Sequence, residues 1–344
     1  MKLMICGDIH WSTYSSILRS RGNNFSTRLE GLIKSMNWVE QISKEYKCDE
    51  EIFLGDTFDR PEVDSESITA TREIEWNNTA RLRHFIVGNH ESGVSSLIYN
   101  STQILHKMGV VEDRPYLYPL DDKTEILFLP YITEDDRLPF KEYLKNRDMS
   151  KKLIVFSHND IKNFQMGGFI SKTGFSIEEI ESNCDLYING HLHNCGKVTN
   201  KIINLGVLSG CNFSEDAFKY EHHIAILDTD TLEIMYIENP YAFNFYKIEV
   251  ETESDLKQLD KLKDNAVVSI KCLNTLKTKM SQVASSKKNI IMCKAVFYSN
   301  ADVSDDAEVK TIAREDHIEQ FRKYIIETLG NSDIVKDELS EVCK

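Results

Sequence analysis

Four short sequences of one type recur in the first two hundred residues, and they constrain the fold more than any other feature of the chain. Each starts with a glycine, continues with Asp, Asn or His, and follows an apolar run: GDIH at 7–10, GDTFD at 55–59, GNHE at 88–91 and GHLH at 190–193. A glycine at the end of a strand lets the backbone turn sharply and approach a ligand closely. The repeated pattern predicts several strands that end at one common site.

The apolar runs before these sequences have the length of buried strands. They lie at residues 3–6, 51–54, 83–87, 152–156 and 186–188. Between the first two runs, apolar side chains three and four residues apart form one stripe over residues 29–42, which predicts an amphipathic helix. Strands alternating with helices are typical of an α/β layered domain, in which ligands gather beyond the carboxyl ends of the strands.

The pattern changes after residue 245, which predicts a division of the chain. We expect a first domain over residues 1–245 and a small α+β domain over 246–300, with strands at 247–250, 265–273 and 289–298 and a helix at 274–286. An acidic linker and a helical hairpin are expected over 301–344. Such a hairpin either packs on its own domain or docks on a partner.

The polar side chains of the repeated sequences are of the types that bind divalent cations. Together with a further segment, FSHND at 156–160, they supply seven candidate ligands: Asp8, His10, Asp56, Asn89, His158, His191 and His193. Mixed carboxylate, imidazole and amide ligands suit ions such as Mn²⁺, Fe²⁺ or Zn²⁺. Seven ligands exceed the need of one catalytic ion, and a carboxylate can bridge two ions about 3.5 to 4 Å apart. The set predicts a two-metal site suited to hydrolysis at phosphorus.

In order and context these motifs resemble those of the calcineurin-like metallophosphoesterase superfamily, and the layout that follows them is similar to that of SbcD-type DNA exonuclease subunits. The motif match covers roughly residues 1–205. The resemblance implies an α/β fold: a metallophosphoesterase β-sandwich flanked by helices, then a small α+β capping domain and a C-terminal helical hairpin.

The resemblance also distributes the seven ligands over two ions that share one carboxylate. The first ion is expected on Asp8, His10, Asp56 and His193. The second is expected on Asp56, Asn89, His158 and His191. Mn²⁺ is the expected metal, with Mg²⁺, Fe²⁺ and Zn²⁺ as alternatives. His90 is the expected catalytic residue, which donates a proton to the leaving oxygen or steadies the transition state.

Three further residues are expected to support the site. Asp59 and Arg60 could be a ligand and a phosphate clamp, but we interpret them as an ion pair that buttresses the GDTFD loop. Glu91 stands where the family usually has Asp, and we expect it to change the surroundings of Asn89 or His90. The segment LGVLSGC at 205–211 lacks the Gly-Ser-Pro that SbcD-type chains often show there.

Charge and cysteine content bear on partners and compartment. The net charge of −14 argues against a basic face for nucleic acid. Bound cations would cancel part of this acid where a phosphate sits, and a separate partner could supply the remaining contacts. The eight cysteines form no CxxC pair, so thiols are expected. We expect a cytoplasmic protein without a membrane segment, because neither a signal-peptide pattern nor a long apolar run occurs.

Three functions from different classes remain open. The resemblance implies a Mn²⁺-dependent DNA nuclease that forms a homodimer and binds an SbcC-like ATPase through the hairpin, in DNA end processing, recombination or repair. The same metal centre would also serve a phosphomonoesterase, a nucleotide phosphodiesterase or a phosphoprotein phosphatase. A non-catalytic scaffold is the third hypothesis, and the complete set of ligand-type residues argues against it.

Other groups of His and Cys are given structural interpretations. A zinc site on Cys184, His191, His193 and Cys195 fits no common spacing. His84, His106 and His317 lack companions of the ligand type and are interpreted as core or surface residues.

Overall fold

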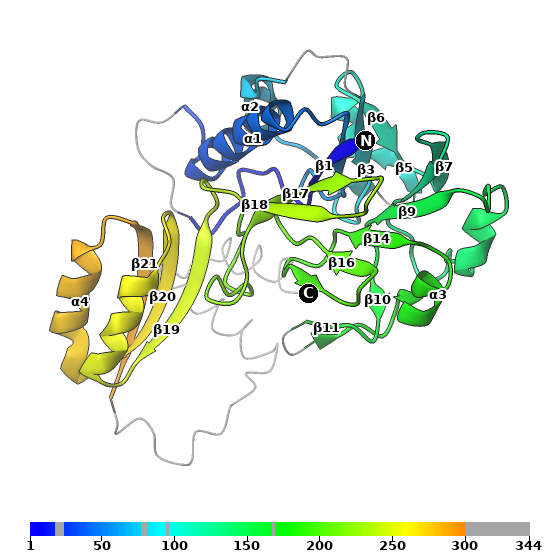
Figure 1. Cartoon of the computed structure of the whole chain (residues 1–344). Helices are drawn as coiled ribbons and strands as arrows, with labels where there is room; N and C mark the ends of the chain where they lie inside the picture. Colours follow the sequence, from blue (N-terminus) through cyan, green and yellow to red (C-terminus); the bar gives the residue numbers. More distant parts are fainter. Residues whose placement is uncertain (18–23, 77–81, 94–95, 167–168, 300–344) are drawn as a thin grey trace, which may run out of the picture. The chain divides into compact units, whose positions relative to one another are not determined.

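The computed structural model describes residues 1–17, 24–76, 82–93, 96–166 and 169–299 (Figure 1). Contacts divide the chain into two compact units, Met1–Phe297 and Tyr298–Lys344. The predicted linker and hairpin at 301–344 lie outside the described residues.

The first unit contains two six-stranded sheets. The first sheet has the order β18-β17-β1-β2-β3-β6. Its strands are β1 (Lys2–Cys6), β2 (Glu50–Phe53), β3 (Leu82–Ile86), β6 (Val110–Glu112), β17 (His223–Asp228) and β18 (Ile234–Glu238). Strands β1, β2, β3 and β6 are parallel, and β17 pairs with β1 in the antiparallel sense. The four parallel strands therefore end at the same edge of the sheet.

The second sheet has the order β15-β16-β14-β9-β8-β7. Its strands are β7 (Tyr116–Pro119), β8 (Thr124–Leu129), β9 (Lys152–Ser157), β14 (Leu186–Asn189), β15 (Gly196–Lys197) and β16 (Ile202–Asn204). Strands β8, β9, β14 and β16 are parallel, and the two outer strands are antiparallel. This sheet also presents a row of carboxyl ends.

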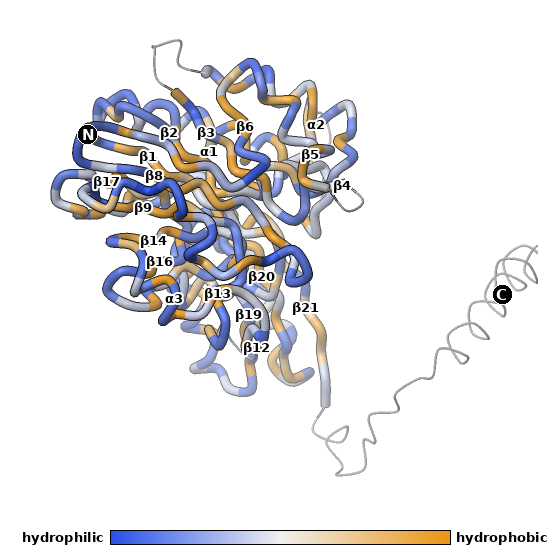
Figure 2. Tube along the Cα trace, turned by 90° about the vertical axis from the view of Figure 1, so that its right-hand side faces the viewer, coloured by the Kyte–Doolittle hydropathy of each residue, from blue (hydrophilic) through white to orange (hydrophobic). Residues whose placement is uncertain are grey.

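Alternation along the strands explains how the two sheets pack. Leu3 and Ile5 of β1 belong to the same buried cluster as Phe128 of β8 and Phe156 of β9. Met4, the residue between Leu3 and Ile5, belongs to the cluster on the other face of the first sheet. Successive side chains of a strand point to opposite faces, so one strand serves both cores. Both faces of such a strand are buried, so its residues form a nearly continuous apolar run, and Figure 2 shows hydrophobic residues concentrated along the strands of the two sheets.

Helix α1 (Thr27–Glu45) covers the outer face of the first sheet. Ser26 starts the helix because its side chain accepts a hydrogen bond from the Leu29 amide at 3.2 Å. Its apolar stripe, which includes Leu32 and Val39, packs in the cluster that contains Met4. The other helices against the sandwich are short: α2 (Ser65–Ala70) and α3 (Ile177–Glu181).

A three-stranded sheet follows the sandwich, in the order β19-β20-β21. Its elements are β19 (Asn244–Val250), η4 (Glu253–Lys261), β20 (Ala266–Leu273), η5 (Asn274–Leu276), α4 (Lys277–Ser286) and β21 (Ile290–Tyr298). A separate buried cluster, which includes Ile248, Leu259 and Met280, holds these elements together. The division of the chain at residue 245 stays a prediction.

The mixed α/β fold class is confirmed, with several sheets and few helices. The eight predicted strands and the two predicted helices are present, with ends that differ by up to three residues. Among the described residues no helix combines the length and apolar character needed to cross a membrane. The seven described cysteines are all free thiols.

Candidate metal centre

The carboxyl ends of five parallel strands bring all seven predicted ligands to one place. Asp8 and His10 follow β1, Asp56 follows β2, and Asn89 follows β3. His158 follows β9 of the second sheet, while His191 and His193 follow β14. Because both sheets present these ends on the same side of the sandwich, residues far apart in sequence come within a few ångströms of one another.

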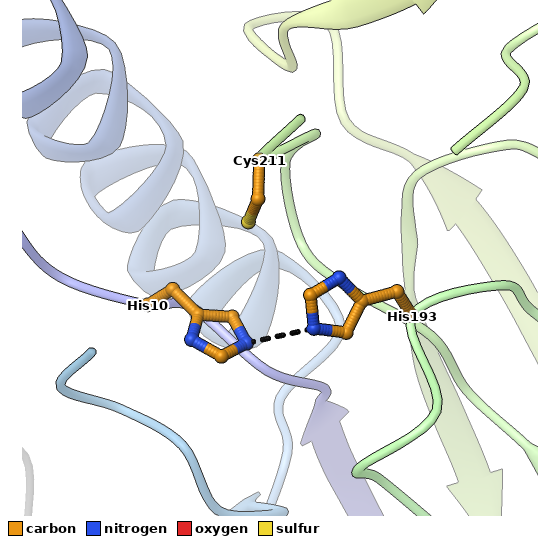
Figure 3. Close-up of side chains that lie close together, drawn as sticks. All are labelled: His10, His193 and Cys211. Atoms are coloured by element: carbon orange, nitrogen blue, oxygen red, sulfur yellow. Dashed lines mark hydrogen bonds between the residues drawn. The ribbon is translucent and has the colours of Figure 1, made fainter. Parts of the chain in front are cut away.

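The first cluster contains the four residues expected to hold the first ion. The Nε2 atoms of His10 and His193 lie 3.0 Å apart, and Figure 3 shows the two rings facing each other. His10 Nε2 lies 4.0 Å from Asp8 Oδ2 and 3.9 Å from Asp56 Oδ2. Two carboxylate oxygens and two ring nitrogens thus surround one small volume.

The second cluster contains the residues expected to hold the second ion. His158 Nε2 lies 3.2 Å from Asp56 Oδ2 and 3.1 Å from Asn89 Oδ1. His191 Nδ1 lies 2.9 Å from the same Asn89 oxygen. Asp56 Oδ2 therefore faces both clusters, as a bridging carboxylate must.

The two carboxylates are held so that one oxygen of each stays directed at the clusters. Asp8 Oδ1 accepts a hydrogen bond from the His191 amide at 3.0 Å, and Asp56 Oδ1 accepts one from the His90 amide at 2.9 Å. Asp8 Oδ2 is buried and has no hydrogen-bond partner in the described part of the chain. A buried carboxylate oxygen without a partner is costly, and a divalent cation among these donors would satisfy it. The residues present fit two divalent cations.

Buried charge shifts the pKa values of two of these residues strongly. Burial acts to raise the pKa of Asp56, but His158, His10 and His90 hold it well below its ordinary value. Burial acts to lower the pKa of His158, but Asp56 and Asp8 raise it to about 9. The site therefore attracts positive charge, and a divalent cation would compete with the proton on His158 because the neutral ring is the metal ligand.

Three of the predicted ligands have a left-handed backbone. The φ angles are 50° at His10, 45° at Asp56 and 71° at His191. Residues other than glycine rarely adopt this region, and such strain gathers at functional sites. Close packing adds a second constraint, since a Cβ at Gly88 would lie 2.1 Å from Asp56 Oδ1.

Carboxylates and a backbone carbonyl contact the histidine nitrogens that face away from the two clusters. His10 Nδ1 contacts Asp59 Oδ1 at 3.1 Å, and His193 Nδ1 contacts Glu215 Oε1 at 3.0 Å. His191 Nε2 lies 3.4 Å from Asp160 Oδ1, and His158 Nδ1 lies 2.8 Å from the Leu54 carbonyl. The hydrogen bond to His191 lowers the pKa of Asp160 to about 2. Partners of this kind fix the ring orientation and the tautomer of metal-binding histidines.

The predicted ion pair of Asp59 and Arg60 is loose, because their closest nitrogen and oxygen are 3.9 Å apart. Asp59 makes its short contact with His10, and it also lies 3.6 Å from His90 Nδ1. Arg60 is 56% exposed, and its guanidinium lies 4.6 Å from the centre of the Tyr14 ring. The main contact of Asp59 is therefore with histidine. Glu215 and Asp160 were not singled out from the sequence at all.

His90 lies at the mouth of the site, where a nitrogen of its ring is within 4.8 Å of donor atoms of His10 and Asp56. Its Nδ1 is 3.1 Å from the Asp59 carbonyl oxygen, and its side chain is 43% exposed. With Tyr14, Arg28 and Arg60 it lines a cavity of about 490 Å³ in front of His10. The ring is thus open to a substrate.

Glu91 is buried and joins two of the motif loops. Its carboxylate accepts hydrogen bonds from the Phe58 amide at 3.0 Å and the Gly88 amide at 2.8 Å. Burial, with the charge of Asp56, raises its pKa to about 7. Glu91 therefore ties the GDTFD loop to the GNHE loop that carries Asn89.

The remaining candidates have structural surroundings. Cys184 packs in the buried cluster with Tyr187, which leaves the supposed zinc set incomplete. His84 is buried between two carboxylates. Its Nδ1 lies 2.8 Å from Glu112 Oε1, and its Nε2 lies 3.3 Å from Glu50 Oε2. His106 is exposed, and His317 lies outside the described residues.

Comparison with known proteins agrees with this geometry. Residues 1–195 match the family model described as calcineurin-like phosphoesterase. The chain belongs to this family. Calcineurin-like phosphoesterases are hydrolases that act on phosphoester bonds with two divalent metal ions. A comparison with curated proteins gives no match.

Solved structures give distant likenesses to this phosphoesterase. A dimetal phosphatase from Danio rerio has a TM-score of 0.42 at 12% identity, covering 70% of this chain and 99% of that one. A phosphoesterase from E. coli has a TM-score of 0.33 at 14% identity, covering 70% and 100%. A metallophosphoesterase from Sphaerobacter thermophilus has a TM-score of 0.33 at 12% identity, covering 83% and 100%.

Proposed function

We propose that this phosphoesterase is a DNA nuclease that hydrolyses phosphodiester bonds with two Mn²⁺ ions, as the nuclease subunit of an SbcC–SbcD-type complex. The observation that carries the chemistry is the position of Asp56. Its Oδ2 lies 3.9 Å from His10 Nε2 on one side and 3.2 Å from His158 Nε2 on the other. Two ions at such a site supply a nucleophile at neutral pH and stabilise charge on the phosphoryl oxygens.

The protein's own residues orient and protonate the substrate in this proposal. The Asp59 carbonyl accepts the Nδ1 proton of His90, so Nε2 is the nitrogen that can reach a leaving oxygen. A general acid at this place protonates the departing sugar oxygen. Tyr14 and Arg60 line the same cavity and can contact the phosphate backbone or stack on a base.

DNA as the substrate is supported by the layout of the chain. A small sheet with one α-helix follows the phosphoesterase sandwich. SbcD-type chains, which the sequence resembles, have a similar layout. We propose that residues 246–300 form a capping domain, that the chain forms a homodimer, and that the segment 301–344 docks on an SbcC-like ATPase. Weaker ATPase binding by a chain that lacks residues 316–344 is expected, and unchanged binding would remove the docking proposal.

The decisive experiment is a cleavage assay on linear DNA with added Mn²⁺. The full chain, alone and with the ATPase, should cleave DNA, and EDTA should abolish the cleavage. Asp56→Asn is the matched variant, because it keeps the shape of the side chain and removes the bridging charge. No cleavage of any DNA under these conditions would overturn the assignment of the substrate.

Phosphomonoesters and nucleotides are the second candidate substrates. The net charge of −14 favours a small substrate over a polyanion that must be held along its length. Parallel assays with p-nitrophenyl phosphate and bis-p-nitrophenyl phosphate separate the classes. Rapid turnover of the monoester alone would favour this second function.

A further inference from the structure

Cys211 lies beside the first cluster. Its Sγ atom and the ring nitrogens of His10 and His193 all lie within 4.8 Å of one another. Figure 3 shows the sulfur turned toward the gap between the two rings. We propose that Cys211 is an additional ligand of the cation held by His10 and His193, and that it selects a soft or borderline ion such as Zn²⁺ at this one site. The inference rests on the proposed two-metal centre, and it changes the metal of the first position from Mn²⁺ to this softer ion.

The spacing of the donors suits a metal with nitrogen and sulfur ligands. Bond lengths of about 2.0 Å to nitrogen and 2.3 Å to sulfur put tetrahedral ligand atoms roughly 3.3 to 3.6 Å apart. The two ring nitrogens, at 3.0 Å, are already near this separation. The sulfur, at no more than 4.8 Å from them, needs an approach of at most roughly 1.3 Å to reach this separation.

A second observation points to a ligand at the same place. Asp8 Oδ2 is fully buried, has no hydrogen-bond partner in the described part of the chain, and lies 4.0 Å from His10 Nε2. The unpartnered carboxylate oxygen thus lies next to His10 Nε2, one of the nitrogens grouped with the Cys211 sulfur.

The surroundings of Cys211 hold the sulfur in place. Arg28, a buried residue of α1, donates a hydrogen bond from its guanidinium to Sγ at 3.2 Å. The Cys211 amide donates to both carboxylate oxygens of Glu215, at 3.1 and 3.0 Å. Glu215 also contacts His193 Nδ1, so one carboxylate positions both the thiol and the imidazole. A bound cation would displace the thiol proton to solvent, and the resulting thiolate would accept a stronger hydrogen bond from Arg28.

A sulfur ligand makes the two metal positions chemically different. Thiolate favours soft and borderline ions, whereas carboxylate and amide oxygens suit Mn²⁺ and Mg²⁺. The second cluster has an amide oxygen, from Asn89, where the first has Cys211. The centre would then hold two different metals, with the softer ion on the first cluster.

Cobalt substitution tests the inference without an activity measurement. The metal-free full chain is titrated with Co²⁺ under reducing conditions. Two bound equivalents and a thiolate-to-cobalt charge-transfer band in the near ultraviolet are expected. Cys211→Ser should keep both equivalents and lose the band. Cys293→Ser is the control, because Cys293 is exposed on β21, and it should keep the band.

Cadmium binding gives a second readout. Cys211→Ser should weaken Cd²⁺ binding at one of the two positions by at least about tenfold and leave Mn²⁺ binding unchanged. Two bound Co²⁺ without the band in the wild-type chain, or a band that survives in Cys211→Ser, would overturn the inference and leave the two-metal centre standing. A chain that binds no Co²⁺ at all would overturn both.

Discussion

Replacing Glu215 by Gln should weaken cation binding on the first cluster while the fold survives. In the native chain the carboxylate, which is 5% exposed, forms hydrogen bonds with His193 Nδ1 at 3.0 Å and with the Cys211 amide. Gln keeps the shape and one acceptor, so the contact with His193 becomes a neutral hydrogen bond. A hydrogen bond to a charged group contributes about 1.5 to 3 kcal/mol and a neutral one about 0.5 to 1.5 kcal/mol. The midpoints of these ranges differ by about 1.2 kcal/mol, which corresponds to roughly eightfold weaker binding.

Removing the side chain should have a larger effect. Glu215→Ala deletes every contact with His193 and Cys211, and loss of such a partner of a metal ligand costs up to about 100-fold in metal affinity. Calorimetric titration of the metal-free full chain with Mn²⁺ measures both variants. Glu233→Gln is the matched control, because it removes the same charge from an exposed residue.

The result that would refute this reasoning is specific. If Glu215→Gln bound Mn²⁺ as tightly as Glu233→Gln, the carboxylate would not hold His193 for the cation. The unfolding temperature of the metal-free variants separates this outcome from general destabilisation. The prediction would also be contradicted if Glu215→Gln lowered the free energy of unfolding by as much as it lowered the free energy of metal binding.

Three further predictions concern other parts of the chain. His90→Ala should keep two bound metals and lose nearly all hydrolysis, because all seven predicted ligands remain in this variant; intact turnover would remove His90 from the mechanism. Gly88→Ala should lower the number of bound metals as well as the stability, because the new methyl group would lie 2.1 Å from Asp56 Oδ1. A variant that still binds two metals would show that the loop moves to accommodate the methyl group. Burial acts to lower the pKa of His84, but its two carboxylate neighbours raise it. The stability that His84 contributes should therefore be complete below pH about 6.5 and be lost as the pH rises through the raised pKa. Urea unfolding of wild type and His84→Gln at several pH values measures this, and a difference that does not change with pH would contradict it.

Local patterns in the sequence were sufficient for the strands that lead to the site. The runs at β1, β2 and β3 combine apolar residues with a glycine-polar sequence at the end, and both signals lie within ten residues. Strand β8 has an equally apolar sequence, TEILFL, but no such motif follows it, and it was not predicted. Strand β16 has three residues, which is too short for periodicity to distinguish it from a loop.

Side chains that orient the ligands could not be predicted in this way. Glu215 lies 22 residues after His193, in a segment between β16 and β17 with no motif of its own. It reaches His193 because the segment after β16 lies beside the end of β1, where Asp8 pairs with Val207, and this pairing is a property of the fold and not of any local sequence. Cys211 comes to the first cluster by the same path. Asp160 had a local signal, since it closes the FSHND segment that provides His158, but its role becomes visible only with His191 in place.

The left-handed backbone at His10, Asp56 and His191 has a consequence for protein engineering. Glycine would relieve roughly 1 to 2 kcal/mol of strain at each position, so a screen for heat resistance alone would favour it there. Each such gain would delete a donor from the metal centre. Directed evolution of this chain toward thermal tolerance would therefore drift toward an inert protein unless metal content or turnover is screened in every round.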